Sequence, residues 1–126
     1  MHRSRIGVVL IDHQQNDWER GAAFWAGVQG VQPVPDEGDD TYASLGRIGS
    51  VSLESQRTGE GTPARVHLDI ETDDVPAEIA RVVALGASVV EDRDDYAVLL
   101  DPGGLVFCVV PVQTGELFER EARSWP

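Results

Sequence analysis

The chain has no lysine, and this shortage of positive charge narrows its possible partners. All ten cationic side chains are arginine, against 22 aspartate and glutamate residues, so the formal net charge is −12. Every contact to a phosphate group would form against that negative field, so nucleic acid is not expected as a partner. A cationic ligand would instead be attracted.

Cysteine and long apolar runs are equally scarce. The single cysteine, Cys108, excludes an intramolecular disulfide and fits a reducing compartment. No run approaches the ~18 apolar residues of a membrane span, and residues 6–11 are too short for the core of a signal peptide. We therefore expect a cytoplasmic protein that makes no membrane contact.

Several catalytic signatures are also missing from the sequence. It has no glycine-rich phosphate loop, no nucleophile elbow and no Cys-x-x-Cys motif. Nucleotide binding and hydrolase chemistry are therefore disfavoured. What remains is a chain of 126 residues with 41% hydrophobic content, which is typical of one packed domain.

The second half carries the clearest pattern, a strand followed by a helix and three strands. Residues 65–71 alternate between apolar and polar side chains, which predicts a strand with one face on a helix and one polar face. Asp74 fits the N-cap of the helix, Pro76 its first turn and Gly86 its left-handed end. The three strands are expected at 88–91, 96–100 and 105–110.

A weaker copy of this pattern precedes it. We expect a strand at 5–12 and a helix at 17–28, with a capping box from Asn16 to Glu19 and stop signals at Gly27 and Gly30. A short strand is a candidate at 31–34, where Pro33 and Pro35 confine it to a sheet edge or exclude it, and strands follow at 42–48 and 50–58. The helix stripe of Trp18 and Trp25 indicates core packing, although Trp25 at the helix end could line a binding site. Two similar units indicate an internal duplication.

In the order and spacing of these motifs, the chain resembles the vicinal oxygen chelate superfamily of glyoxalase and bleomycin-resistance proteins, in particular its glyoxalase-like branch. The residues that carry the resemblance are Phe24-Trp25, Ser55-Gln56-Arg57, Arg65-Val66-His67-Leu68-Asp69-Ile70 with Asp73-Asp74, Leu85-Gly86-Ala87, and the segment from Asp101-Pro102-Gly103-Gly104 to Cys108.

The resemblance implies an α+β fold in which two βαβββ modules form curved mixed sheets around a cleft. Within a single domain of residues 1–126, the modules would span about 5–58 and 64–111, followed by a tail at 112–126. Relatives of this length usually pair, so a homodimer is expected. Trp125 in the tail would fold back on the core or reach the second subunit.

Metal-dependent members of the superfamily place a histidine on the first strand of each module and a carboxylate on the last. His67 fills the first-strand position of the second module, whereas Cys108 stands where the carboxylate is expected. In the first module the histidine position falls near Val8 or Leu10, and the carboxylate position near Glu54 or Gln56. Only His67 matches the metal enzymes, so no cofactor is favoured.

A metal would need more ligands than His67 alone, because catalytic sites usually have three protein ligands. Glu54, Cys108 and His13 are the remaining donors, and the cysteine would favour zinc over manganese, with iron and nickel as other options. The alternative for Cys108 is a small buried hydrophobic residue.

Acid–base chemistry is a separate reading of the same region. Asp69 lies on the same strand face as His67, so the two could form a proton-transfer pair, although a partly solvated carboxylate is the simpler expectation. Asp12 at a strand end is a second candidate base. Its neighbour His13 would point to the opposite face, and both could equally be a polar surface pair.

These observations favour a metal-free protein that binds a small organic molecule, either aromatic or cationic. The expected ligand-binding residues are Trp25, Glu54, Gln56, His67 and Cys108. One alternative is a metal-dependent lyase, isomerase or dioxygenase. The other is a metal-free acid–base enzyme that uses His67 with Asp69 or Asp12.

Overall fold

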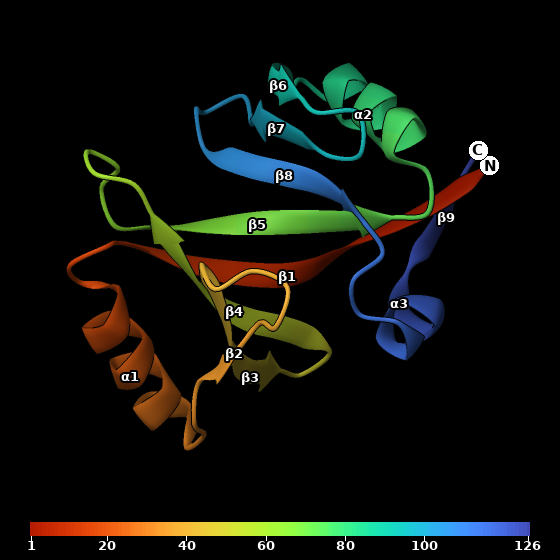
Figure 1. The fold of residues 1–126 in the computed structure, drawn as a ribbon. Helices are drawn as coiled ribbons and strands as arrows, with labels where there is room; N and C mark the ends of the chain where they lie inside the picture. Colours follow the sequence, from red (N-terminus) through yellow and green to blue (C-terminus); the bar gives the residue numbers. More distant parts are fainter. The chain divides into compact units, whose positions relative to one another are not determined.

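The computed structural model describes residues 1–126 and divides them into two compact units (Figure 1). Unit 1 comprises residues 1–8 and 67–126, and unit 2 comprises residues 9–66. No helix is long and apolar enough to cross a membrane. The elements are β1 (His2–Gln14), α1 (Trp18–Gln29), β2 (Val34–Pro35), β3 (Tyr42–Ile48), β4 (Val51–Thr58), β5 (Arg65–Thr72), α2 (Val75–Ala84), β6 (Ser88–Asp92), β7 (Ala97–Leu100), β8 (Val106–Pro111), α3 (Glu116–Glu121) and β9 (Arg123–Trp125).

Each unit contains one strand–helix–three-strand run, so the predicted α+β class with curved mixed sheets is confirmed. The first run is β1, α1, β2, β3 and β4, and the second is β5, α2, β6, β7 and β8. Most predicted boundaries lie within two residues of the observed ones, but β1 begins at His2, three residues before the predicted start. β2 lies at the sheet edge, where Pro35 is tolerated because an edge strand need not donate every N–H group.

Unit 2 has the strand order β2-β3-β4-β1, and α1 packs on one face of this sheet. The contact is made by small side chains, because Ala22 and Ala26 of α1 are buried against Leu45 and Leu53. α1 ends at Gly30, whose φ of 73° is the left-handed conformation that glycine adopts without strain. The predicted stop at Gly30 is therefore confirmed.

Two expectations for α1 are wrong. The N-cap is Asp17, whose side chain makes no capping hydrogen bond, so the capping box from Asn16 does not form. The two tryptophans lie outside the alanine-lined core. Trp25 is 37% exposed, and Trp18 lies beneath the guanidinium of Arg57, at 5.3 Å from its ring centroid.

Unit 1 has the strand order β1-β5-β8-β7-β6, in which β5 and β8 are parallel and β7 runs antiparallel to both of its neighbours. α2 packs on one face, where Val82 joins a core of strand residues. As predicted, Asp74 caps α2 by accepting a hydrogen bond from the Ala77 N–H at 3.1 Å, and Gly86 has a positive φ. Val83, the next residue along the helix, points outward and is 43% exposed. The core members are Val82, Ala97, Leu99, Phe107 and Val109, with Leu68 and Ile70 packed against them.

The two ends of the chain meet in unit 1, where Trp125 folds back onto the first strand. β9 pairs antiparallel with β1, with Trp125 opposite His2, and the Trp125 indole N–H donates to Ser4 Oγ at 2.8 Å. His2 and Ser4 both bind the buried carboxylate of Glu78, at 2.7 and 2.8 Å. Arg81 completes this terminal cluster by binding Glu78 and lying 3.9 Å over the Trp125 ring.

A second buried carboxylate, Glu71, holds the connection between β8 and α3. It is fully buried, forms an ion pair with Arg5 at 3.1 Å, and accepts hydrogen bonds from the N–H groups of Gln113 and Thr114 at 2.8 and 2.9 Å. Gly7 gives this carboxylate its space, because a Cβ at that position would overlap the Glu71 side chain. The strand therefore requires glycine there for steric reasons.

Gly7→Ala is expected to lower the free energy of unfolding by roughly 1–3 kcal/mol, the usual cost of forcing extra atoms into a packed interior. Urea denaturation followed by circular dichroism measures this change. Gly27→Ala is the matched control, since a Cβ on this helical residue meets nothing within 4 Å and should stabilise α1 slightly. Equal stability of the two variants would contradict the steric role of Gly7.

Candidate functional site

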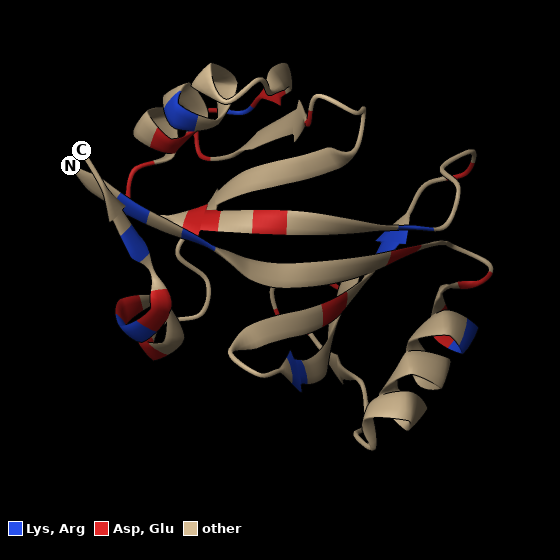
Figure 2. Ribbon diagram, turned by 180° about the vertical axis from the view of Figure 1, so that it is seen from behind, with Lys and Arg blue, Asp and Glu red and all other residues tan.

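The polar face of β5 carries the first two residues of the candidate site. Leu68 and Ile70 pack toward the α2 core, so His67 and Asp69 point to the opposite face of the sheet. Both are buried, with only 6% and 7% of their surface exposed. The expectation of a partly solvated Asp69 is therefore wrong. Figure 2 shows the acidic positions along β5 in red.

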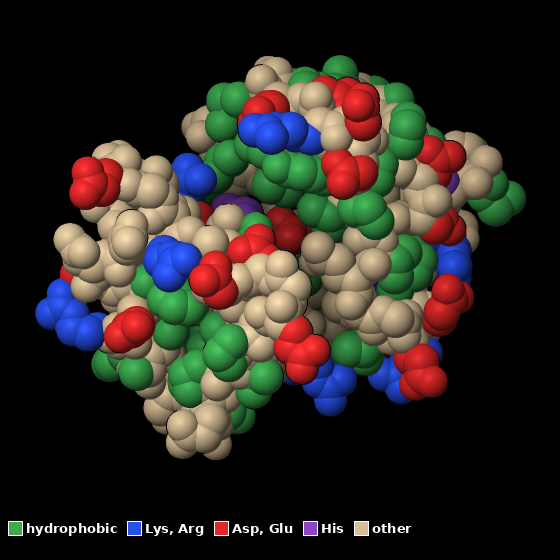
Figure 3. Space-filling model, viewed as in Figure 1, with side chains coloured by type: hydrophobic (Ala, Val, Ile, Leu, Met, Phe, Trp, Pro, Cys, Tyr) green, Lys and Arg blue, Asp and Glu red, His purple; other side chains and the backbone are tan.

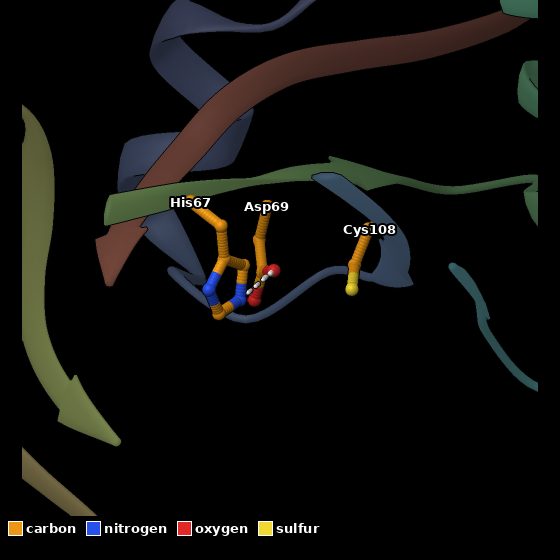
Figure 4. A group of neighbouring side chains, drawn as sticks. All are labelled: His67, Asp69 and Cys108. Atoms are coloured by element: carbon orange, nitrogen blue, oxygen red, sulfur yellow. Dashed lines mark ion pairs between the residues drawn. The ribbon is translucent and has the colours of Figure 1, made fainter. Parts of the chain in front are cut away.

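Cys108 joins this pair from the neighbouring strand. The parallel register pairs Asp69 of β5 with Cys108 of β8, which places both side chains on one face (Figure 4). His67 Nε2 lies 3.7 Å from Asp69 Oδ1, and donor atoms of all three residues lie within 4.8 Å of one another. Cys108 is half-buried and lies outside the α2 core, so it is not the buried hydrophobic residue of the alternative reading.

A strip of apolar side chains borders the three residues. Val98 of β7 pairs with Cys108, and Leu100 pairs with Val106. All three valine and leucine side chains are half-buried, whereas Ala97 and Leu99 point into the core. Figure 3 shows apolar side chains, in green, over β7 and β8. The strip was missed in the sequence, although the unbroken apolar run of residues 97–100 is the signal that could have found it, because such a run puts apolar side chains on both faces of a strand.

Glu71 lies on the same face of β5 but belongs to the framework of unit 1. Its carboxylate is held by Arg5 and by the two backbone N–H groups that follow β8. Because these contacts occupy both of its oxygens, Glu71 fixes the chain around the candidate site. His67, Asp69 and Cys108 are left as the groups that a ligand would meet.

In unit 2, Asp12, Glu54 and Gln56 lie on the sheet face turned away from α1, because Ile11 and Leu53 on the same strands face the helix. The structure gives each of the three a different environment. Asp12 is fully buried and accepts a hydrogen bond from Arg65 Nε at 3.1 Å. Gln56 donates from its amide nitrogen to the Tyr42 hydroxyl at 2.9 Å.

Burial raises the pKa of Glu54, and the nearby negative charge of Asp36 raises it further. Both effects disfavour the charged carboxylate.

His13 and Trp25 lie on the other side of the unit 2 sheet. The His13 ring lies so close to Gly21 of α1 that a Cβ there would overlap it, and Trp25 packs edge-on against Phe24 with 5.1 Å between ring centroids. His13 and Glu54 are thus on opposite faces, which rules out their sharing one metal ion. Asp12 and His13 point to opposite faces, as predicted.

The chain belongs to the family described as the glyoxalase-like domain, whose model matches residues 8–110. A search of curated proteins finds no match. The assignment agrees with the resemblance seen in the sequence.

Solved structures share the fold at low sequence identity. A hypothetical protein from Bacillus halodurans is 14% identical with a TM-score of 0.62, covering 87% of this chain and 95% of its own. A variant methylmalonyl-CoA epimerase from Streptomyces coelicolor is 13% identical with a TM-score of 0.52, covering 87% and 96%. The 2,2',3-trihydroxybiphenyl 1,2-dioxygenase of Sphingomonas wittichii is 16% identical with a TM-score of 0.52, covering 89% and 42%.

Metal-dependent members of the superfamily raise the question of whether this donor set fits a metal ion. Around a tetrahedral zinc the ligand atoms lie ~3.3–3.8 Å apart, given the usual bond lengths. The 3.7 Å between His67 Nε2 and Asp69 Oδ1 meets this requirement, and Cys108 adds a third donor within 4.8 Å. The His67–Asp69 pair therefore has the spacing of zinc ligands, and Cys108 is the third donor that would complete such a site in unit 1. Val8 and Leu10 are buried apolar residues that offer no donor.

Glu54→Gln is expected to stabilise the protein above the raised pKa of Glu54. The folded chain holds this proton more tightly than the unfolded chain, so Glu54 favours folding below its ordinary pKa of 4.5 and loses that contribution as the pH rises through the raised value. Glutamine does not ionise. The gain in free energy of unfolding should therefore be present at pH 7 and shrink on acidification.

Denaturant titrations at several pH values measure this gain. Glu60→Gln removes the same charge from an exposed turn and serves as the control. A Glu54→Gln effect that is independent of pH, or that equals the control at pH 7, would contradict the burial of this carboxylate.

Proposed function

We propose that the protein binds a small organic molecule on the unit 1 face formed by His67, Asp69 and Cys108. The observation that carries this proposal is a buried histidine–carboxylate pair beside a half-buried apolar strip. A few convergent polar groups on an otherwise apolar surface are typical of small-molecule sites. The named enzymes that share the fold, an epimerase and a dioxygenase, also act on organic molecules.

The charge and lining of this face favour a ligand that is aromatic, cationic or both. The formal net charge of −12 attracts cations, and Asp69 supplies a carboxylate within the site. Val98, Leu100 and Val106 offer apolar contact for a flat ring. An anionic ligand would meet both the local carboxylate and the overall negative field.

His67 is the group through which a bound molecule would exchange a proton. Imidazole is well suited to this transfer near neutral pH, and Asp69 at 3.7 Å restricts the orientation of the ring. Turnover by this pair would make the protein a metal-free acid–base enzyme. The binding proposal does not require turnover.

A second candidate function is metal-dependent catalysis, which the close grouping of three donor atoms favours. His67, Asp69 and Cys108 would hold a zinc ion and leave a fourth position for water or substrate. Such an ion supplies Lewis-acid polarisation of a bound oxygen. The chain's own contribution would be to fix the geometry of the ion through the paired strands β5 and β8.

His67→Ala is expected to weaken ligand binding at least ~10-fold, which corresponds to about 1.4 kcal/mol. It should lower the melting temperature less than His2→Ala does, because His67 lies 3.7 Å from its carboxylate partner whereas His2 is hydrogen-bonded to Glu78 at 2.7 Å. The probe is benzyltrimethylammonium, titrated into 15N-labelled protein and followed by NMR. Amide signals of β5 and β8 should shift, and benzoate, an anion with the same aromatic ring, should produce no comparable shifts.

His2→Ala is the matched control, because His2 and His67 are both 6% exposed but His2 belongs to the terminal cluster. It should lower the melting temperature and leave binding intact. The proposal fails if the probe shifts no signal on β5 or β8, or if His67→Ala binds as tightly as the wild type.

Metal content separates the two candidate functions. Protein purified from medium supplemented with zinc, iron, manganese and nickel is analysed for bound metal by elemental mass spectrometry. The metal-free proposal predicts far less than one ion per chain, unchanged in Asp69→Asn. Near-stoichiometric zinc that is lost in Asp69→Asn and Cys108→Ser would instead establish the metal site.

A further inference from the structure

We propose that Cys108 is a covalent acceptor for uncharged α,β-unsaturated carbonyl compounds, with His67 as proton acceptor and Asp69 as the residue that positions the imidazole. This role rests on the proposed function, because the same face of unit 1 must first admit a small organic molecule. It adds a reactive group and a substrate class to that face.

The three side chains supply the groups that nucleophilic addition by a thiol requires: a nucleophile, a base and a carboxylate beside the base. Cys108 is the most accessible of them, whereas His67 and Asp69, which project from the same face of the sheet (Figure 4), are more than nine-tenths buried. The imidazole lies within 4.8 Å of the sulfur and is paired with the carboxylate at 3.7 Å. A nucleophile next to a base that a third group orients is the arrangement of activated thiols and hydroxyls.

The surroundings of Cys108 select the class of electrophile. Its cross-strand neighbour is Val98, and the adjacent pair is Leu100 with Val106, so the thiol opens onto apolar side chains. An uncharged, partly apolar molecule fits this strip, and an anionic reagent would be repelled by a chain of net charge −12. An α,β-unsaturated aldehyde or ketone meets both conditions and offers the soft carbon that sulfur attacks.

The addition balances without any other reactant. The Cys108 sulfur forms a bond to the β-carbon while His67 takes the thiol proton, and the electron pair of the carbon–carbon double bond moves toward the carbonyl group. His67 then returns the proton to the α-carbon. The product is a thioether that contains every atom of both reactants, so no oxidant and no leaving group are involved.

The composition of the chain makes this addition simple to measure. With one cysteine and no lysine, the only other nucleophiles toward an unsaturated aldehyde are the three histidines and the N-terminal amine, and the Cys108→Ser variant identifies the thiol adduct. The probe is trans-2-hexenal, with hexanal as a saturated control that lacks the reactive double bond. Intact-mass spectrometry follows the adduct over time, and Cys108→Ser should form no comparable adduct.

The folded wild type should add hexenal at least ~10-fold faster than the same chain unfolded in urea. His67→Ala should slow the addition ~10- to 100-fold, the low end of what a positioned base contributes. For Asp69→Asn, a positioning role lowers the maximal rate of addition and leaves the half-saturating hexenal concentration unchanged. The inference is overturned if the folded chain reacts no faster than the unfolded one, or if His67→Ala reacts as fast as the wild type.

Two parallel measurements separate this inference from the proposed function. Benzyltrimethylammonium binding by the wild type, without accelerated hexenal addition by the same protein, would contradict the covalent role alone. If neither probe binding nor accelerated hexenal addition is observed, the proposed binding face is contradicted as well. Stoichiometric zinc in the purified protein that blocks the addition would also overturn the inference, because Cys108 would then be a metal ligand.

Discussion

The parallel pairing of β5 with β8 is the constraint on which the candidate site depends. Its register sets Asp69 opposite Cys108, and the alternation of side chains brings His67 to the same face. A slip of one residue would turn Cys108 into the α2 core and bring Phe107 to the polar face. The pairing is protected against such a slip because Phe107 and Val109 must remain buried with Val82 and Leu99.

Local patterns in the sequence predicted the elements well because they depend on nearby residues. The alternation in residues 65–71 gave both the strand and its polar face, and Asp74 and Gly86 marked the ends of α2. The wrong predictions for α1 arose where two adjacent residues could each be the N-cap, or where two sets of side chains could each form the buried face of the helix. Asp17 rather than Asn16 occupies the N-cap of α1, and small alanines rather than tryptophans make its buried face.

The site was predicted in part, and the missing part is non-local. His67, Asp69 and Cys108 were all candidates, but nothing in the sequence alone fixed the register that joins them. The burial of Asp69 was also misjudged. Glu71 is enclosed by Arg5 from the first strand and by backbone N–H groups that follow β8. These partners lie far from Glu71 in the sequence, so no local pattern could predict them. Family membership fixes the fold and leaves the chemistry to these particular side chains.

The meeting of the two chain ends in the terminal cluster has a consequence for how this protein can be cut and joined. The family model stops at residue 110, yet the residues beyond it pair with the first strand and reach the carboxylate of Glu78 through Ser4. The strands β1 and β9 therefore hold each other in place. A deletion of either strand would leave the other strand without its partner. A short linker joining His2 to Trp125 would preserve this strand pairing, so a circularly permuted chain could have its new termini at an exposed turn elsewhere.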